Sequence, residues 1–106
     1  MMNNTFCILG GDMRQLYCAK AIMNDGYTVY ISCFEECIDK LPFEELEVRR
    51  AIRKSDTIIL PLPVTKNGTI LNAPFGKIPV MLDDSFARAC LGKRVFCGMK
   101  ERLLST

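Results

Sequence analysis

The chain has 106 residues, a length that fits one domain with a single hydrophobic core. Hydrophobic residues make up 49% and charged residues 25%, which excludes an intrinsically disordered chain. The formal net charge of +2 is too small to indicate binding to nucleic acid or to a charged membrane surface. There is no basic leader, and no apolar run approaches the roughly 20 residues that span a bilayer, so we expect a soluble, cytoplasmic protein.

The six cysteines predict reduced thiols rather than a disulfide framework. Cys7 and Cys97 fall in apolar strand patterns and Cys18 in an amphipathic helix, where a thiol serves as a small hydrophobic side chain. Cys33 and Cys37 could begin a metal site, but the chain has no histidine and no second pair at matching spacing. We therefore expect no bound metal and a reducing compartment.

The first half of the chain predicts a strand, a helix and a second strand. Residues 5–9 form an apolar run that ends in two glycines, as a buried strand would. Residues 13–24 repeat apolar side chains at helical spacing, with Asp12 placed to cap the helix and Gly26 to end it. Residues 27–32 are rich in β-branched and aromatic side chains and predict the second strand.

The second half predicts two more helices and two more strands. After an irregular stretch we expect a helix that starts at Glu44, with acidic residues near its start and the basic residues up to Lys54 on its solvated face. Its apolar stripe is Val48, Ala51 and Ile52. The further expected elements are a strand at 56–60, a hairpin-type turn at Asn67-Gly68, a helix at 83–91, a strand at 93–97 and a final helical turn at 99–104.

This alternation predicts an α/β domain with three layers, of the flavodoxin or Rossmann type, around a mainly parallel sheet of about four to five strands. Ligands of such sheets bind beyond the carboxyl ends of the strands. We therefore expect the functional surface at residues 10–15, 61–65, 72–75 and 97–99.

The loop at residues 10–15 does not match the dinucleotide-binding fingerprint. Asp12 and Gln15 stand where that pattern needs glycine, and no acid directly ends the second predicted strand. A carboxylate at Asp12 would also repel a pyrophosphate. We therefore predict no cofactor-binding residue in this chain.

Arg14 falls in the first turn of a predicted helix, where a positive charge is unfavourable unless it has a partner. One interpretation is an anionic ligand such as a carboxylate, held by Arg14 with Gly11, Asp12 and the neutral amide of Gln15 beside it. The other is structural: Asp12 caps the helix, Arg14 pairs with Asp12, and Gln15 is solvated. The spacing leaves both open.

The other candidate contacts for a polar ligand are Pro63, Thr65 and Asn72, although threonine and asparagine are also common in turns. Without histidine the chain has no Ser-His or Cys-His pair, so no catalytic residue is predicted.

Four segments occur in an order that resembles a known family: Gly10-Gly11-Asp12-x-Arg14-Gln15, the run from Leu60 to Thr65, Leu71-Asn72-Ala73-Pro74-Phe75, and the run from Val95 to Met99. Together they are similar to the N-terminal domain of the dipicolinate synthase A-subunit, which belongs to a bacterial sporulation enzyme.

The resemblance implies a flavodoxin-like domain followed by a Rossmann domain that binds NAD(P), beside a flavoprotein-like B-subunit. It implies oxidation of hydroxy-tetrahydrodipicolinate, a cyclic dicarboxylate, to dipicolinate in the mother cell. The candidate residues would then form this domain's half of the interdomain cleft: Gly11, Asp12, Arg14, Gln15, Pro63, Thr65 and Asn72. One departure is Cys97, where the family pattern has glycine.

On this view residues 1–106 are one domain, expected to be the N-terminal part of a longer homo-oligomeric enzyme and inactive alone. A second hypothesis is a non-enzymatic module that docks a partner through an exposed apolar patch at Pro74 and Phe75. A third is a free-standing nucleotide-binding domain.

Overall fold

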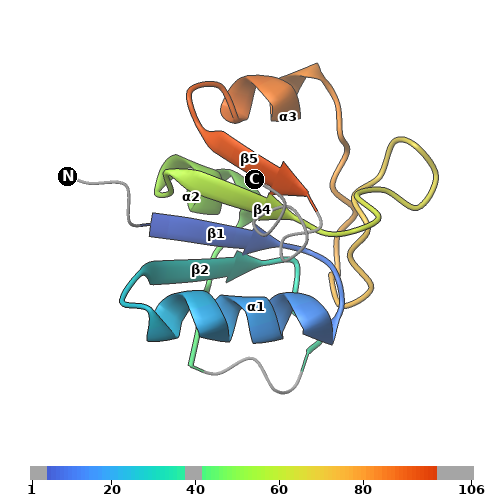
Figure 1. The fold of residues 1–106 in the computed structure, drawn as a ribbon. Helices are drawn as coiled ribbons and strands as arrows, with labels where there is room; N and C mark the ends of the chain where they lie inside the picture. The colour runs from blue at the N-terminus through green and yellow to red at the C-terminus, as the bar shows by residue number, and fades with distance from the viewer. Residues whose placement is uncertain (1–4, 38–41, 98–106) are drawn as a thin grey trace.

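The computed structural model describes residues 5–37 and 42–97, which fold as an α/β domain (Figure 1). Its elements are β1 (Thr5–Leu9), α1 (Met13–Asn24), β2 (Thr28–Ser32), β3 (Glu44–Glu45), α2 (Val48–Arg53), β4 (Thr57–Leu60), α3 (Asp84–Ala89) and β5 (Arg94–Cys97). The described strands form one sheet of five, in the order β3-β2-β1-β4-β5, with parallel pairing throughout. The predicted fold class is confirmed.

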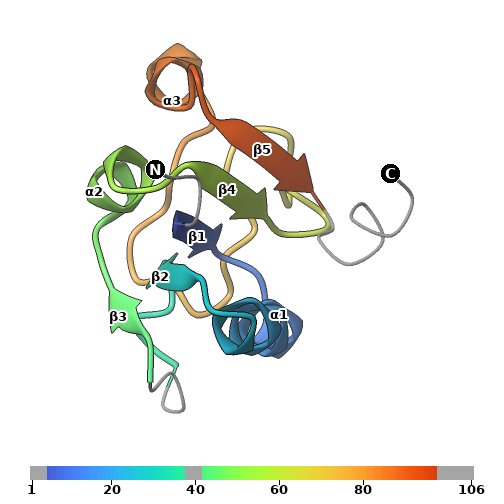
Figure 2. The same cartoon turned by 60° about the vertical axis from the view of Figure 1, so that its left-hand side comes forward.

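The helices cover both faces of the sheet, α1 on one side and α2 with α3 on the other (Figure 2). Successive residues of β1 point to opposite faces, so Ile8 packs in the cluster that contains α1, and Cys7 and Leu9 in the cluster that contains α2. All three side chains are fully buried. An apolar run without alternation is what a central strand covered on both faces requires.

Two cysteines illustrate the burial. Burial raises the pKa of the Cys7 thiol to about 12 and that of Cys33 to about 12. Both groups therefore stay protonated near neutral pH. Cys7 serves as the small buried hydrophobic side chain that the sequence predicts.

The prediction of a helix that starts at Glu44 was wrong, because a short strand occupies its first two positions and the helix begins later. Glu44 and Glu45 pair with Tyr30 and Ile31 of β2 as the edge strand β3. The Glu45 carboxylate accepts a hydrogen bond from the Phe34 backbone N–H at 2.8 Å, which ties this segment to the end of β2. The helix α2 starts at Val48, after the N-cap Glu47.

The turn predicted at Asn67-Gly68 is confirmed, because Thr65 and Leu71 form an antiparallel bridge across it. The final helical turn predicted at 99–104 lies outside the described residues. None of the helices in the described ranges has the length and hydropathy that crossing a bilayer requires.

Candidate functional site

Three loops meet beyond the carboxyl ends of β1 and β4, and we call them the strand-end loops: residues 10–15, 61–65 and 71–75. Asn72 joins them. Its carbonyl oxygen accepts from the Gly11 N–H at 2.8 Å, and its own N–H donates to the Val64 carbonyl at 2.8 Å. Its side-chain Nδ2 donates to the Pro63 carbonyl at 3.0 Å. The sequence placed these loops on one edge, and the structure brings them into contact.

The close approach of these loops requires glycine at two positions. Gly10 has φ of 64°, and a Cβ there would lie 2.7 Å from the Asn72 carbonyl oxygen. Gly11 has φ of 85°, and a Cβ there would collide with Cγ of Gln15 and lie 3.0 Å from Cβ of Pro61. Both positions combine a left-handed backbone with the absence of space for a side chain.

Asp12 caps α1 and also holds Arg14. Its Oδ1 accepts from the Arg14 N–H at 3.0 Å and from Arg14 Nε at 3.1 Å. This hydrogen bond to the Arg14 side chain lowers the pKa of Asp12 below its ordinary value of 3.8. The structure therefore confirms the interpretation in which Asp12 caps the helix and pairs with Arg14. The Arg14 side chain is nevertheless 77% exposed, and its terminal amino groups have no partner among the described residues. They can still reach an anion.

Gln15 is buried, whereas the same interpretation expected it to be exposed to solvent. It is only 7% exposed and lies in the first turn of α1, where its side chain and that of Pro61 both border Gly11. Its side-chain nitrogen Nε2 is buried and has no hydrogen-bond partner within the described part of the chain. Leaving such a donor unpaired costs about 1–3 kcal/mol. Buried polar groups are nearly always paired, so this atom is a candidate donor to an acceptor from outside the described residues.

The other three candidates lie in the same loops with structural partners. Thr65 Oγ1 accepts from the N–H groups of Asn67 and Gly68, at 3.2 and 2.8 Å, and so shapes the turn. Pro63 is exposed, follows a cis peptide bond, and gives its carbonyl to Asn72. A ligand contact by any of the three stays a prediction.

The apolar patch expected at Pro74 and Phe75 is only partly exposed. Phe75 is half-buried and packs on Phe34, with ring centroids 6.2 Å apart. Most of its surface is therefore committed to the core beneath α1, and Pro74 alone is exposed. Phe75 therefore offers less surface than expected, and docking through this patch stays a prediction.

Residues 5–106 match the sequence model of the N-terminal domain family of the dipicolinate synthase A-subunit. The chain belongs to this family. The match includes all four segments on which the resemblance was based, and it covers every residue that the structure describes. No curated protein matches the chain.

Two solved structures of the dipicolinate synthase A-subunit are similar to this family member. The structure from Bacillus subtilis has a TM-score of 0.68 at 22% identity, over 99% of this chain and 36% of that one. The structure from Bacillus halodurans has a TM-score of 0.69 at 16% identity, over 91% of this chain and 32% of that one. At this identity the likeness shows the fold. The chain spans about a third of the length of each.

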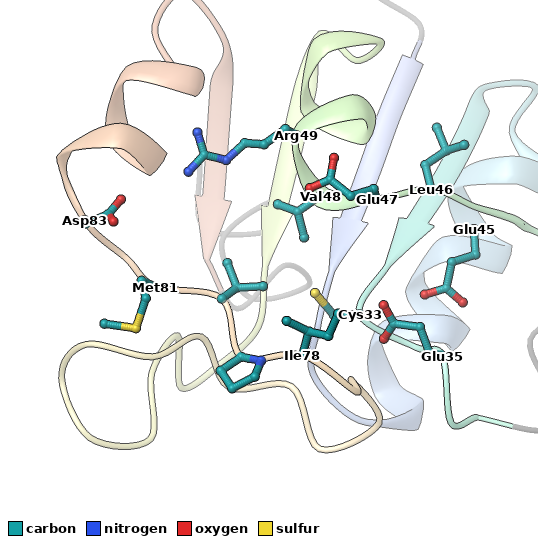
Figure 3. Close-up of a pocket in the computed structure, with 12 residues that line it drawn as sticks. Cys33, Glu35, Glu45, Leu46, Glu47, Val48, Arg49, Ile78, Met81 and Asp83 are labelled. Carbon is teal, nitrogen blue, oxygen red and sulfur yellow. The ribbon is translucent and has the colours of Figure 1, made fainter.

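The strand-end loops of this family member thus contain an exposed cation at Arg14 and, at Gln15, a buried amide nitrogen without a partner among the described residues. The sequence indicates both residues as candidates, but we did not expect Gln15 to be buried. The sequence did not predict a groove that lies on the α2 side of the sheet. Its lining comes from Cys33, the start of α2 and residues 78–83 (Figure 3).

The pairing of Asp12 predicts a small loss of stability in acid. A carboxylate whose pKa is lowered by folding stabilises the native state above its unfolded pKa, and this contribution disappears as the pH falls through the folded pKa. We expect Asp12→Asn, which keeps the capping oxygen but removes the charge, to flatten the decline in melting temperature below pH about 4. Thermal unfolding followed by circular dichroism from pH about 6 to about 2 measures this. An unchanged pH profile would show that the Asp12–Arg14 pair contributes nothing.

Proposed function

We propose that the strand-end loops form the substrate-facing wall of a catalytic cleft, in a dehydrogenase that makes dipicolinate from hydroxy-tetrahydrodipicolinate. Family membership supports the reaction. The observation that carries the site is the buried Nε2 of Gln15, which has no acceptor among the described residues. A carboxylate oxygen of the substrate would supply that acceptor.

Arg14 and Gln15 offer two kinds of donor at adjacent positions. Arg14 supplies a positive charge that Asp12 orients through Nε, and its terminal amino groups face solvent. Gln15 supplies a neutral donor whose burial makes pairing valuable, because the amide has already lost its water. Each suits a carboxylate oxygen, which can accept several hydrogen bonds.

The described residues do not fit a dinucleotide. The Arg14 N–H in the first turn of α1, which a phosphate would use, already donates to Asp12. The Asp12 carboxylate also places a negative charge at this helix end. In the proposal, NAD(P) is therefore held by a second domain, and this chain provides substrate contacts without a catalytic residue of its own.

The wider assignment follows the family. The substrate is a cyclic dicarboxylate, the flavoprotein-like B-subunit is the partner, and the enzyme acts in sporulation in the cytoplasm of the mother cell. These parts of the proposal rest on family membership, since the chain spans only 36% and 32% of the two solved relatives.

The proposal is tested by titrating the chain with dipicolinate and following backbone amide shifts by NMR. We expect perturbations concentrated at residues 10–15 and 61–65, with a dissociation constant on the order of 1 mM, because half a cleft buries little of the ligand. Unsubstituted pyridine is the matched control ligand and should leave these amides unmoved. If dipicolinate moved none of them at about tenfold this concentration, the proposal would fail.

A further inference from the structure

Two of the strand-end loops differ in chemistry. Residues 10–15 supply the polar groups, since Arg14 is exposed and Nε2 of Gln15 is buried without a partner among the described residues. Residues 61–65 read Pro-Leu-Pro-Val-Thr and contain no charged side chain. A ligand that touches both loops therefore meets hydrogen-bond donors and positive charge on one of them and largely apolar surface on the other.

Leu62 is the exposed leucine of the apolar loop. Its side chain is 55% exposed, whereas Leu60 two positions earlier is 8% exposed and Pro61 is fully buried. Neither of the two core clusters found among the described residues includes Leu62. Single exposed apolar residues are common on protein surfaces, so exposure alone does not indicate a contact. The argument for Leu62 comes from its place beside the polar loop.

Both neighbours of Leu62 are tied to the loop at residues 10–15. Pro61 approaches it directly, because a Cβ at Gly11 would lie only 3.0 Å from Cβ of Pro61. Pro63 is joined through Asn72, whose Nδ2 donates to the Pro63 carbonyl at 3.0 Å and whose own carbonyl accepts from the Gly11 N–H at 2.8 Å. Proline rings also restrict the backbone on either side. Leu62 is therefore held at the site without being packed into the core.

We propose that Leu62 contacts the ring of the ligand whose carboxylate binds at residues 10–15, and that it thereby favours a ring over an open chain. The inference rests on the proposed function, because it concerns the same cleft. A carboxylate oxygen satisfies the donors of the polar loop, and the carbon atoms of a compact ring cover the leucine, which removes apolar surface from water.

An acyclic dicarboxylate offers the same charges but gains less from this leucine. Its chain is flexible, and it must lose conformational freedom to lie along the apolar loop, whereas a ring is already rigid. The leucine covers only one part of the ligand, so we expect it to change the dissociation constant by about three- to tenfold. Leu62 is on this view a specificity-determining residue, and the charged and polar contacts stay with residues 10–15.

Dipicolinate and glutarate are the matched pair of probes. Both carry two carboxylates with three atoms between the carboxyl carbons, but only dipicolinate has a ring. Titration of the 106-residue chain with each ligand near neutral pH, followed by NMR at the backbone amides of residues 10–15, gives two dissociation constants. We expect dipicolinate to bind more tightly than glutarate.

Leu62→Ala should weaken dipicolinate binding by about three- to tenfold and change glutarate binding by less than about twofold. Leu62→Met, which keeps an apolar side chain of similar size, should retain most of the preference for dipicolinate. Leu62 is more than half exposed, so neither change should disturb folding. Leu91→Ala is the matched control, because Leu91 is 74% exposed just before β5, at the amino end of the sheet, and its truncation should change neither dissociation constant.

Nuclear Overhauser effects between protein and ligand report the contact itself. We expect them between the methyl protons of Leu62 and the ring protons of dipicolinate, and we expect none at the methyl protons of Leu91. A change in stability alone would not produce this signal.

The proposal would be overturned by equal effects of Leu62→Ala on the two ligands, by equal effects of Leu62→Ala and Leu91→Ala on dipicolinate, or by the absence of the Leu62 signal in the dipicolinate complex. In each of these cases dipicolinate would still shift the amides of residues 10–15, so the proposed cleft would stand. Absence of those shifts in the unsubstituted chain would instead refute the cleft and the role of Leu62 together.

Discussion

Replacing Gly10 by alanine is expected to destabilise the chain by about 2–5 kcal/mol, a large part of the stability of a small domain. One part is the left-handed backbone, with φ of 64°, which a Cβ disfavours. The larger part is contact, because the added Cβ would lie 2.7 Å from the Asn72 carbonyl oxygen and 3.2 Å from both Cβ of Ala73 and Cδ2 of Leu71. Urea unfolding followed by circular dichroism measures the loss.

Gly68→Ala is the matched control for backbone strain. Gly68 also has a left-handed φ, 94°, but a Cβ there would meet nothing within 4 Å. We expect it to cost only about 1–2 kcal/mol, the backbone part alone. Equal losses in the two variants would contradict the close packing of the strand-end loops, and in a Gly10→Ala protein that stays folded we expect dipicolinate shifts at residues 10–15 to weaken.

The elements that sequence patterns predicted correctly are those fixed by local chemistry. The run at Ile58, Ile59 and Leu60 has no alternation because β4 is buried on both faces. Asp12 caps α1 and Asp83 caps α3, as short acidic side chains before a helix do. These features depend on residues within a few positions of one another, so spacing is sufficient to find them.

The strand β3 shows where local patterns fail. Two consecutive glutamates have little preference for a strand, and their position just before α2 favoured a helix start. What holds them in the sheet is tertiary: Phe43 is buried in the core, and Glu45 accepts from the Phe34 N–H across eleven positions. No window of sequence shows that contact.

Some features of the candidate site could likewise be predicted from the sequence, and others could not. The parallel-sheet rule placed the strand-end loops together, and the spacing of Asp12 and Arg14 gave their pairing as one of two open interpretations. The burial of Gln15 was missed, although Gln15 precedes Ala19 by four positions and Ile22 by seven and therefore falls on the buried side of α1. The joining role of Asn72 is carried largely by its backbone groups, which every residue type except proline shares.

Replacing Gln15 by methionine should separate stability from binding. Methionine is close to glutamine in size and has no donor, so it removes the unpaired Nε2 without leaving a cavity. We expect the variant to gain about 1 kcal/mol, or about 4–8 °C in melting temperature for a domain of this size. We also expect it to lose the dipicolinate shifts at residues 10–15.

The opposite signs of these two effects are what identify a functional residue. A residue kept for packing loses stability when it is replaced, whereas a strained or unpaired group kept for a ligand costs stability and supplies binding. Lys20→Met, at an exposed position of the same helix, controls for helix propensity and should change neither quantity appreciably. If Gln15→Met instead lowered stability and left dipicolinate binding intact, Gln15 would be a structural residue and the cleft would have to be sought elsewhere among the strand-end loops.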